Sequence, residues 1–303
     1  YTKNISSTKI KEKIFKASTL PENRITMLRR LINAKKIVRI LESHNSLTGL
    51  IIEKLKIKKK KKFVEFDGMW SSSLTDSITR GKPDNQSVDY STRIAGLNEI
   101  LDVTTKPLIF DADNGGRIEH LSYLVKTLER LGVSAMVMED KVGLKKNSLF
   151  SDQTGAKQDG IKNFCKKINF AKNSKKTDDF MIIARIESFI LKKGLSDALK
   201  RAEAYSKAGA DAILIHSKEK SPDQIFSFSK RFLKSEFTKP LIAVPSTYSK
   251  TYEKRLVENG FKVVIYANHL LRASYSAMVF AAKKILNYQR SFEVEKKISS
   301  IND

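Results

Sequence analysis

The run "VSAMVMEDKVGLKKNS" at residues 133–148 joins two kinds of sequence. Its first part, "VSAMVM", is apolar but for one serine, which is typical of a strand covered on both faces, as in parallel sheets. The run then turns polar at Glu139, Asp140 and Lys141 and ends in Asn147 and Ser148. Charges directly after a buried strand are where α/β folds place their chemistry. The stretch therefore predicts a strand that ends at a functional loop.

The same pattern recurs along the chain. Apolar runs that turn abruptly polar lie at 36–45, 66–73, 107–115, 134–141, 180–188, 211–217, 240–247 and 262–269. Between them, segments such as 117–132 and 195–209 carry apolar residues at helical spacing. Several helical segments end in a glycine just before a strand, as at Gly132, Gly209 and Gly260, and glycine commonly ends a helix in the left-handed conformation.

Eight such units predict an α/β fold, the (β/α)8 TIM-type barrel, with its active site at the carboxyl ends of the strands. A doubly wound open sheet is the alternative. We expect residues 1–31 to be a lead-in and residues 32–303 to form one barrel domain with C-terminal helices. The lysine-rich segment 55–66 predicts a small β insertion after strand one, and the apolar face of helix 273–292 predicts packing on a neighbouring subunit. The chain begins with Tyr1 instead of Met, which leaves open a longer parent protein.

The composition limits the classes of function. The formal net charge of +24 would attract nucleic acid, anionic lipid or anionic metabolites. However, the lysines are scattered over predicted helices, with one dense block at Lys58–Lys62, and no nucleic-acid-binding module accompanies them. A solvated surface is therefore favoured over nucleic-acid binding. Cys165 is the only cysteine, which excludes an intrachain disulfide and a cysteine zinc cluster. No apolar run reaches membrane-spanning length and no signal-peptide pattern opens the chain, so a cytoplasmic protein is expected.

Polar side chains gather where the predicted strands end. Asp111 and Asp113 fall on the same side of one strand end, and Glu139 follows the adjacent strand. Three carboxylates at one edge suit Mg²⁺, which prefers oxygen ligands and usually retains waters. The alternative is that each carboxylate caps a helix or pairs with a lysine.

The neighbouring strand ends suit an anionic substrate. Arg185 ends an apolar run, where it needs an anionic partner, and that partner is either a phosphate or Glu187. His216 ends another run, and the serines after Trp70 offer hydroxyl and N–H groups for a carboxylate or phosphate. Residues 143–160 form a long polar segment of the kind that closes over a site, here called the lid loop. Neither the phosphate-loop motif nor the Rossmann glycine motif is present.

The stretch "EDKVGLKKNS" resembles the E-D-K-x-x-x-x-x-N-S signature of the phosphoenolpyruvate mutase family, in the isocitrate lyase superfamily. The resemblance runs from residue 32 to residue 288. It includes "ESHN", "GMWSSSL", "DAD", "ARIES", "RAEAYSKAGADAILIHSK" and "YANHLLRAS".

The resemblance implies a (β/α)8 barrel that exchanges its last helix between subunits of a homodimer or homotetramer. It implies Mg²⁺-dependent interconversion of phosphoenolpyruvate and phosphonopyruvate, which forms a carbon–phosphorus bond. Asp111 would contact Mg²⁺, with Asp113 and Glu139 holding its waters. The substrate carboxylate would be bound by Ser72 and the Ser73 backbone. Trp70 and Leu74 would form a wall beside the substrate. The phosphoryl group would be bound by Arg185, His216, Asn147 and the adjacent Ser148. Asp84 would lie near the transferring phosphoryl group, and Lys145 would lie on the gating loop.

The sequence departs from the family pattern at two places, and related families offer alternative activities. The D-A-D-T-G-Y-G continuation of the family is here Asp111-Ala112-Asp113-Asn114-Gly115-Gly116, and the 55–66 insertion separates strands one and two. Phosphonopyruvate hydrolase, with water as acceptor, is the nearest alternative, and Asn147 favours the mutase. Isocitrate and methylisocitrate lyases carry a cysteine in the lid loop, which this chain lacks there. An oxaloacetate decarboxylase is a minor alternative.

Overall fold

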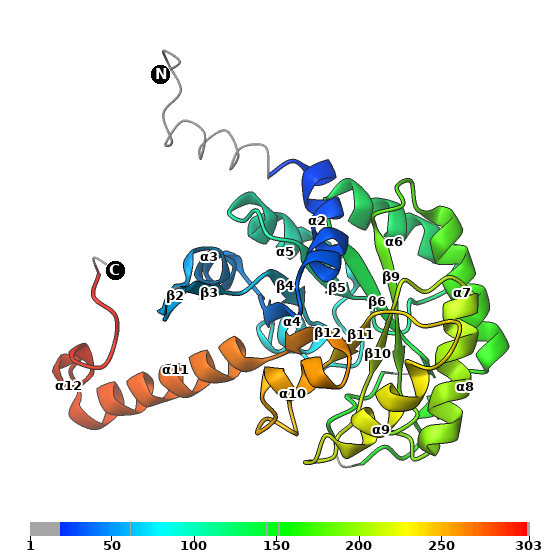
Figure 1. The fold of residues 1–303 in the computed structure, drawn as a ribbon. Coiled ribbons are helices and arrows are strands. Elements are labelled where there is room, and N and C mark those ends of the chain that lie inside the picture. The colour runs from blue at the N-terminus through cyan, green and yellow to red at the C-terminus, as the bar shows by residue number, and fades with distance from the viewer. Residues whose placement is uncertain (1–18, 61, 144, 151, 302–303) are drawn as a thin grey trace.

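The chain folds into a closed parallel barrel in a computed structural model that describes residues 19–60, 62–143, 145–150 and 152–301. Residues 1–18 of the predicted lead-in lie outside the described residues. The strand order round the ring is β1-β12-β11-β10-β9-β6-β5-β4, and every neighbouring pair is parallel (Figure 1). The predicted (β/α)8 barrel is therefore confirmed, and the open-sheet alternative is wrong. The barrel strands are β1 (Val38–Glu42), β4 (Gly68–Ser71), β5 (Leu108–Asp111), β6 (Ala135–Glu139), β9 (Met181–Ile186), β10 (Ala212–Ile215), β11 (Leu241–Ala243) and β12 (Phe261–Tyr266).

Each barrel strand lies within a predicted apolar run, except that β12 begins one residue early at Phe261. Alternate residues face the barrel interior and the surrounding helices, as the pleat of a strand requires. Ile40 and Ile109 belong to the interior cluster, whereas Leu41 and Phe110 pack in the layer beneath the helices. Because both faces are buried, the strands need apolar residues at every position.

Helices surround the barrel and close one end of it. Leu28 and Ile32 of α2 pack with Val38 and Ala135, which begin β1 and β6, so α2 covers the amino ends of the strands. The carboxyl ends are thereby left for the site. The helices are α2 (Pro21–Ala34), α3 (Ser46–Lys54), α4 (Ser73–Ile78), α5 (Tyr90–Asp102), α6 (Ile118–Arg130), α7 (Ile161–Ser174), α8 (Gly194–Lys207), α9 (Asp223–Phe232), α10 (Glu253–Glu258), α11 (His269–Tyr288) and α12 (Phe292–Glu295).

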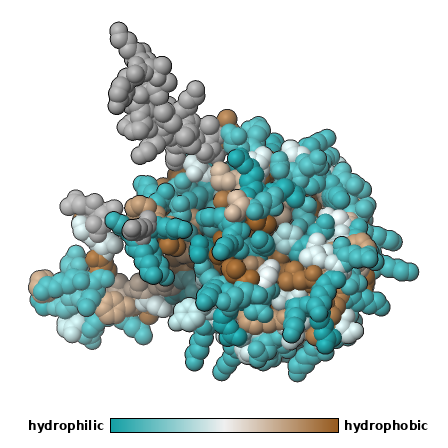
Figure 2. Space-filling model, in the orientation of Figure 1, coloured by the Kyte–Doolittle hydropathy of each residue, from teal (hydrophilic) through white to brown (hydrophobic). Residues whose placement is uncertain are grey.

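Two antiparallel hairpins interrupt the barrel pattern. β2 (Lys56–Lys59) and β3 (Lys62–Glu65) form the β insertion predicted from the lysine block, placed between α3 and β4. All residues of β2 are exposed, and hydrophilic side chains cover most of the visible surface (Figure 2), which fits a solvated lysine-rich exterior. β7 (Lys141–Val142), just before the lid loop, pairs with β8 (Lys157–Gln158), near the end of that loop.

The C-terminal helix α11 leaves the barrel and extends away from it (Figure 1). Its amino end is held by the buried carboxylate of Glu42, whose Oε2 accepts the backbone N–H groups of Leu270 at 3.1 Å and Leu271 at 3.2 Å. Beyond Leu271, no residue of this helix is buried. Within the part of the chain that the structure describes, no helix combines the length and apolarity needed to cross a bilayer.

Gly132 joins α6 to β6 and shows why glycine is required there. Its φ is +84°, and a Cβ built on it would lie 2.7 Å from the Cα of Pro21 at the start of α2. The left-handed conformation costs a residue with a Cβ about 1–2 kcal/mol, and the contact with backbone adds to this cost. The close approach of α2 to this turn therefore depends on the missing side chain.

We expect Gly132→Ala to lower the free energy of unfolding by more than about 2 kcal/mol, measured by chemical denaturation, because strain and overpacking act together. Gly194→Ala is the matched control, because Gly194 also has a positive φ, +81°, but nothing lies within 4 Å of the added Cβ. Its loss should stay near about 1–2 kcal/mol. Equal losses in the two variants would contradict the close approach of α2.

Candidate active site

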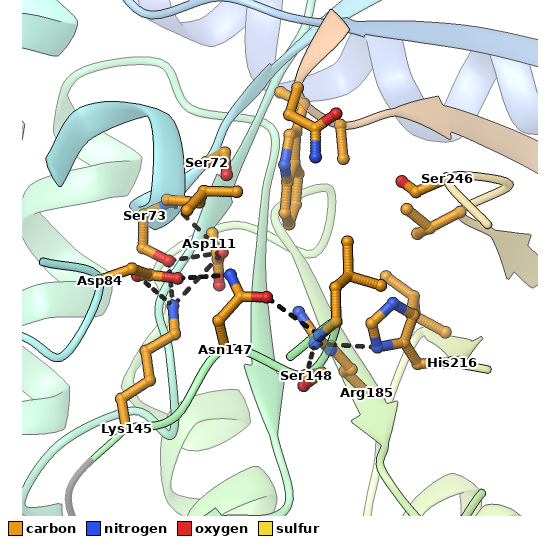
Figure 3. A pocket seen from close by; sticks show the side chains of 17 residues that line it. Ser72, Ser73, Asp84, Asp111, Lys145, Asn147, Ser148, Arg185, His216 and Ser246 are labelled. Carbon is orange, nitrogen blue, oxygen red and sulfur yellow. Dashed lines mark hydrogen bonds and ion pairs between the residues drawn. The ribbon is translucent and has the colours of Figure 1, made fainter. Parts of the chain in front are cut away.

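A cavity of about 50 Å³ lies at the carboxyl ends of the barrel strands. Figure 3 shows side chains from several strand ends pointing into it, together with residues of the lid loop. It is lined by Trp70, Ser72, Ser73, Leu74, Asp84, Asp111, Lys145, Asn147, Ser148, Leu149, Arg185, Leu214, His216, Val244, Ser246, Ala267 and Asn268. The charged residues divide into two groups, one around Asp111 and one around Arg185.

The first group places an ammonium among carboxylates. Lys145 of the lid loop bonds to Asp113, lies 3.0 Å from Asp84 Oδ1 and 4.0 Å from Asp111 Oδ2, and donates to the hydroxyl of Ser73. Ser73 in turn donates from Oγ to Asp111 Oδ2 at 2.9 Å. All of these side chains are buried or nearly so, so the lysine charge and the carboxylate charges neutralise one another within the protein.

Arg93 supports this group from behind. It lies on α5, is buried, and donates from Nη1 to the backbone carbonyl of Asp111 at 2.6 Å. Its Nε donates to Asp76 Oδ2 at 2.9 Å, and Nη1 lies 3.6 Å from Asp113 Oδ2. An arginine within a helical segment carries no sequence signal for such a role, and sequence reasoning missed it.

The two strand-end acids differ in their protonation. Burial would raise the pKa of Asp111, but Lys145, Arg185 and Arg93 hold that pKa at about 2, so the carboxylate is ionised at neutral pH. Burial raises the pKa of Glu139 to about 7, against the opposing effect of Arg185. Glu139 Oε2 makes no hydrogen bond among the described residues and lies 3.4 Å from Arg185 Nη2. Of these two acids, Asp111 therefore stays an anion and Glu139 can carry a proton.

The second group centres on Arg185 and the fully buried Glu187. Arg185 donates from Nε to Glu187 Oε1 at 2.6 Å and from Nη2 to Ser148 Oγ at 2.8 Å. Ser148 also bonds to Glu187, and His216 Nδ1 lies 3.1 Å from Glu187 Oε1. Glu187 is thus the anionic partner of Arg185 within the protein. The hydrogen bonds that Arg185 makes to described residues use Nε and Nη2, which leaves Nη1 for a ligand.

Burial, and then the nearby Arg185, lower the pKa of His216. Its imidazole is therefore neutral at physiological pH. Arg185 Nη2 lies 3.0 Å from His216 Nδ1, and an arginine can only donate. Nδ1 also lies 3.1 Å from Glu187 Oε1, which can only accept, so both of these partners of the ring meet at Nδ1 and Nε2 is the ring nitrogen that remains for a ligand.

The lid loop is fastened over the cavity by its own side chains and by Lys141, which precedes it. Asn147 Nδ2 donates to Asp84 Oδ2 at 2.8 Å. Lys141 Nζ donates to the carbonyl of Lys146 at 2.7 Å and to Ser148 Oγ at 2.9 Å. The loop therefore contacts both charged groups of the cavity, through Lys145 and Asn147 on one side and Ser148 on the other.

The structure brings the predicted site residues together, with two exceptions in position. Asp113 and Glu139 do not line the cavity but lie behind it, bonded to Lys145 and paired with Lys141 respectively. The predicted residues that do line it are Trp70, Ser72, Ser73, Leu74, Asp84, Asp111, Lys145, Asn147, Ser148, Arg185 and His216. Besides Arg93, sequence reasoning left Ser246 out of the site, because a serine after a strand is common anywhere. Lys141 belongs to the polar run after β6 but was given no role there, and it donates to Ser148 of the lid loop.

Among the residues that the structure describes, no three acidic, histidine or cysteine side chains are arranged around one point as metal ligands. Mg²⁺ nevertheless commonly takes one or two carboxylates and completes its shell with water and substrate oxygens. Asp111 is ionised and faces the cavity, a cation already sits among its neighbours, and Glu139 Oε2 lacks a hydrogen bond. The oxygen-rich donor set therefore fits a divalent cation held mainly by Asp111.

Comparison with known proteins places this geometry in a family. The sequence profile described as phosphoenolpyruvate phosphomutase matches residues 28–286. A phosphoenolpyruvate phosphomutase of Tetrahymena pyriformis is 35% identical over 92% of this chain and 89% of its own, and a phosphonopyruvate hydrolase of Variovorax sp. (strain Pal2) is 34% identical over 84% of each chain. A crystal structure of phosphonopyruvate hydrolase in complex with oxalate and Mg²⁺ superposes with a TM-score of 0.81, at 31% identity over 92% of each chain.

We expect Lys145→Met to make folding more sensitive to acid. In the native protein the lowered pKa of Asp111 contributes stability above its ordinary pKa of 3.8, and this contribution is lost as the pH falls through about 2. Without the ammonium the pKa of Asp111 rises, so the loss begins at a higher pH. The free energy of unfolding, measured between about pH 6 and pH 3, should show this shift.

Lys146→Met is the matched control, because Lys146 pairs with the exposed Asp152 and does not line the cavity. Its pH profile should follow that of the native protein. Superimposable profiles for the two variants would refute the placement of Lys145 among the buried carboxylates.

Proposed function

The chain belongs to the phosphoenolpyruvate phosphomutase family, and we propose that it is an isomerase that interconverts phosphoenolpyruvate and phosphonopyruvate with Mg²⁺. The observation that carries the proposal is that Asp111 and Arg185 face one small cavity from different strands. A substrate with a carboxylate at one end and a phosphoryl group at the other matches this division. The lid loop covers both halves.

The Asp111 half binds the carboxylate end. Ser72 and Ser73 line the cavity beside Asp111, and α4 begins at Ser73, so hydroxyl and backbone N–H groups are available to the substrate carboxylate. Trp70 and Leu74 supply an apolar wall. Asp111 would hold Mg²⁺ directly, and Asp113 and Glu139 would hold it through waters. When bound, Mg²⁺ supplies Lewis acidity that stabilises negative charge on the substrate oxygens.

The Arg185 half binds the phosphoryl group. Glu187 holds the guanidinium through Nε, so Nη1 of Arg185 and the amide of Asn147 are positioned as donors, and His216 lines the cavity next to Arg185. In one direction the bond between phosphorus and the enol oxygen breaks, and a bond from phosphorus to the methylene carbon forms. Both bonds belong to one molecule, so catalysis rests on positioning and charge neutralisation. Asp84 lies near the transferring group, with its carboxylate held by Asn147 and Lys145.

Hydrolysis of phosphonopyruvate is the second candidate, because a hydrolase is nearly as similar to this chain as a mutase. The contact of Asn147 with Asp84 favours the mutase, because it closes the lid loop over the cavity and limits the access of water. A nucleic-acid-binding role has no support in the site, and a cytoplasmic location stays a prediction.

Phosphorus NMR of the purified protein with Mg²⁺ and phosphonopyruvate tests the function. We expect phosphoenolpyruvate as the product, whereas inorganic phosphate and pyruvate would instead identify a hydrolase. Asp111→Ala should lower the rate by about 10³-fold or more, because it removes the anion that holds the cation, and should leave the fold intact. Asp223→Ala, an exposed acid on α9, serves as the control. Full turnover by Asp111→Ala would remove the assignment of the metal site.

We propose further that the chain forms a homodimer or homotetramer through α11. The helix extends from the barrel with large apolar side chains exposed, and hydrophobic surface is visible along it (Figure 2). The most exposed apolar residues on it are Tyr275, Met278 and Leu286. Contiguous apolar surface of this kind usually marks an interface, and a second copy of this chain supplies a matching face.

Met278→Glu combined with Leu286→Glu should shift the protein toward monomer in light scattering coupled to size-exclusion chromatography. Each buried anchor contributes enough that its loss weakens association by about tenfold or more. Lys283→Glu on the same helix changes charge without removing an apolar side chain, and it should leave the oligomer in place. A monomeric native protein at micromolar concentration would overturn this proposal.

A further inference from the structure

Asp140 follows β6 and is completely buried, yet it does not line the cavity. Its two carboxylate oxygens bind different parts of the molecule. Oδ1 accepts the backbone N–H of Glu187 at 2.9 Å. Oδ2 accepts from Gln158 Nε2 at 2.9 Å, from Tyr205 Oη at 2.8 Å and from Arg201 Nη1 at 3.2 Å. One buried carboxylate thus joins β9, the lid loop and α8.

The lid loop is closed at its base by the same residue. Asp140 precedes the strand β7, and its carbonyl accepts the backbone N–H of Asp159, which follows β8, at 2.8 Å. Arg201 Nη1 also donates to the carbonyl of Asp159 at 2.8 Å. Both ends of the lid loop therefore meet at Asp140, with Arg201 as a second fastening.

The hydrogen bond between Asp140 and the backbone of Glu187 connects the base of the lid loop to the cavity. Glu187 holds Arg185 at 2.6 Å and His216 at 3.1 Å, and it bonds to Ser148 of the lid loop. Because Asp140 fixes the backbone of Glu187, it sets the position of the phosphoryl-binding pair as well as the base of the lid loop.

Side chains of α8 complete the arrangement. Arg201 donates from Nε to Asp197 Oδ2 at 2.8 Å, and Ser188 Oγ donates to the same oxygen at 2.7 Å. Ser188 also accepts from Gln158 Nε2 at 3.0 Å. Tyr205 donates its hydroxyl proton to Asp140 and packs on Phe164, with ring centroids 4.8 Å apart. Removing one member leaves a buried charged partner short of a hydrogen bond, which is costly.

We infer that Asp140, Arg201 and Tyr205 are positioning residues that hold the lid loop shut during phosphoryl transfer and so keep water away from phosphorus. The inference rests on the proposed function. If the loop opens, water attacks phosphorus and forms a new oxygen–phosphorus bond. The bond from phosphorus to the substrate breaks, the pyruvate enolate that leaves takes up a proton, and the products are pyruvate and inorganic phosphate.

Tyr205→Phe tests the inference, because it removes one hydroxyl and keeps the ring that packs on Phe164. Tyr248→Phe is the matched control, an equally buried tyrosine whose hydroxyl bonds no member of the Asp140 group. Phosphorus NMR with Mg²⁺ and phosphonopyruvate would give the ratio of inorganic phosphate to phosphoenolpyruvate. We expect this ratio to rise about tenfold in Tyr205→Phe and to stay at the native value in the control, since a buried bond to a charged acceptor shifts an equilibrium by about this much.

Trypsin cleavage after Lys145 and Lys146 reports on the lid loop without any turnover. Cleavage tracks the population of the open form when opening is fast, so we expect it to be about tenfold faster in Tyr205→Phe than in the native protein. Gln158→Met removes the two hydrogen bonds that this lid-loop residue makes to Asp140 and Ser188. It should accelerate cleavage to a similar extent, and it keeps the test decisive if Tyr205→Phe fails to fold.

If both variants have native cleavage rates and a native product ratio, the inference is overturned, even where the free energy of unfolding falls. Native protein that turns over neither substrate would instead contradict the proposed function, and trypsin cleavage would still decide whether the Asp140 group fastens the lid loop. Native protein that releases mainly phosphate would overturn the water-excluding role. Trypsin cleavage would then decide whether the Asp140 group fastens the lid loop.

Discussion

Mutual neutralisation of buried charges at the carboxyl ends of the strands is the constraint on which the rest of the site depends. Helices cover the sides of the barrel and α2 closes its amino end, so the carboxyl end is the open one. The charged residues that follow the strands meet there. An unpaired ion there would cost several kcal/mol in desolvation, so each must find a partner of opposite sign. Glu187 does this for Arg185, and Lys145 does it for Asp84 and Asp113.

This constraint divides the cavity into two unlike halves. Around Asp111 the protein supplies an anion whose pKa is held at about 2, which favours a cation. Around Arg185, Glu187 binds Nε and Ser148 binds Nη2 of the guanidinium, so Nη1 remains for a ligand and this half favours an anion. The lid loop contacts both halves, so a ligand that satisfies both would also satisfy the closed loop. Binding and closure are therefore linked through the same charges.

The buried Asp140 shows how the scaffold and the site are connected. Burial raises its pKa to about 6, despite the hydrogen bonds from Glu187 and Tyr205 and the charge of Arg201 that oppose this effect. It lies one residue beyond Glu139, and alternation along the chain turns it away from the cavity toward α8. Neighbouring residues of one motif thus serve two purposes: Glu139 pairs with Arg185 behind the cavity, and Asp140 fastens the loop that covers it.

The sequence by itself determined the barrel and most of the residues around its mouth. Unbroken apolar runs specify strands buried on both faces, glycines such as Gly132 end the helices, and parallel strands bring residues as distant as Asp111, Arg185 and His216 to one edge. These are local signals that repeat along the chain, so the sequence alone is enough to recognise them. Only the tertiary structure decided the partners of each charge: that Arg93 reaches from α5 to the backbone of Asp111, that Glu139 lies behind the cavity, and that Arg201 and Tyr205 meet Asp140. Those pairings depend on how helices pack against strands far away in the chain, and no periodic pattern encodes which of many lysines, arginines and acids will meet.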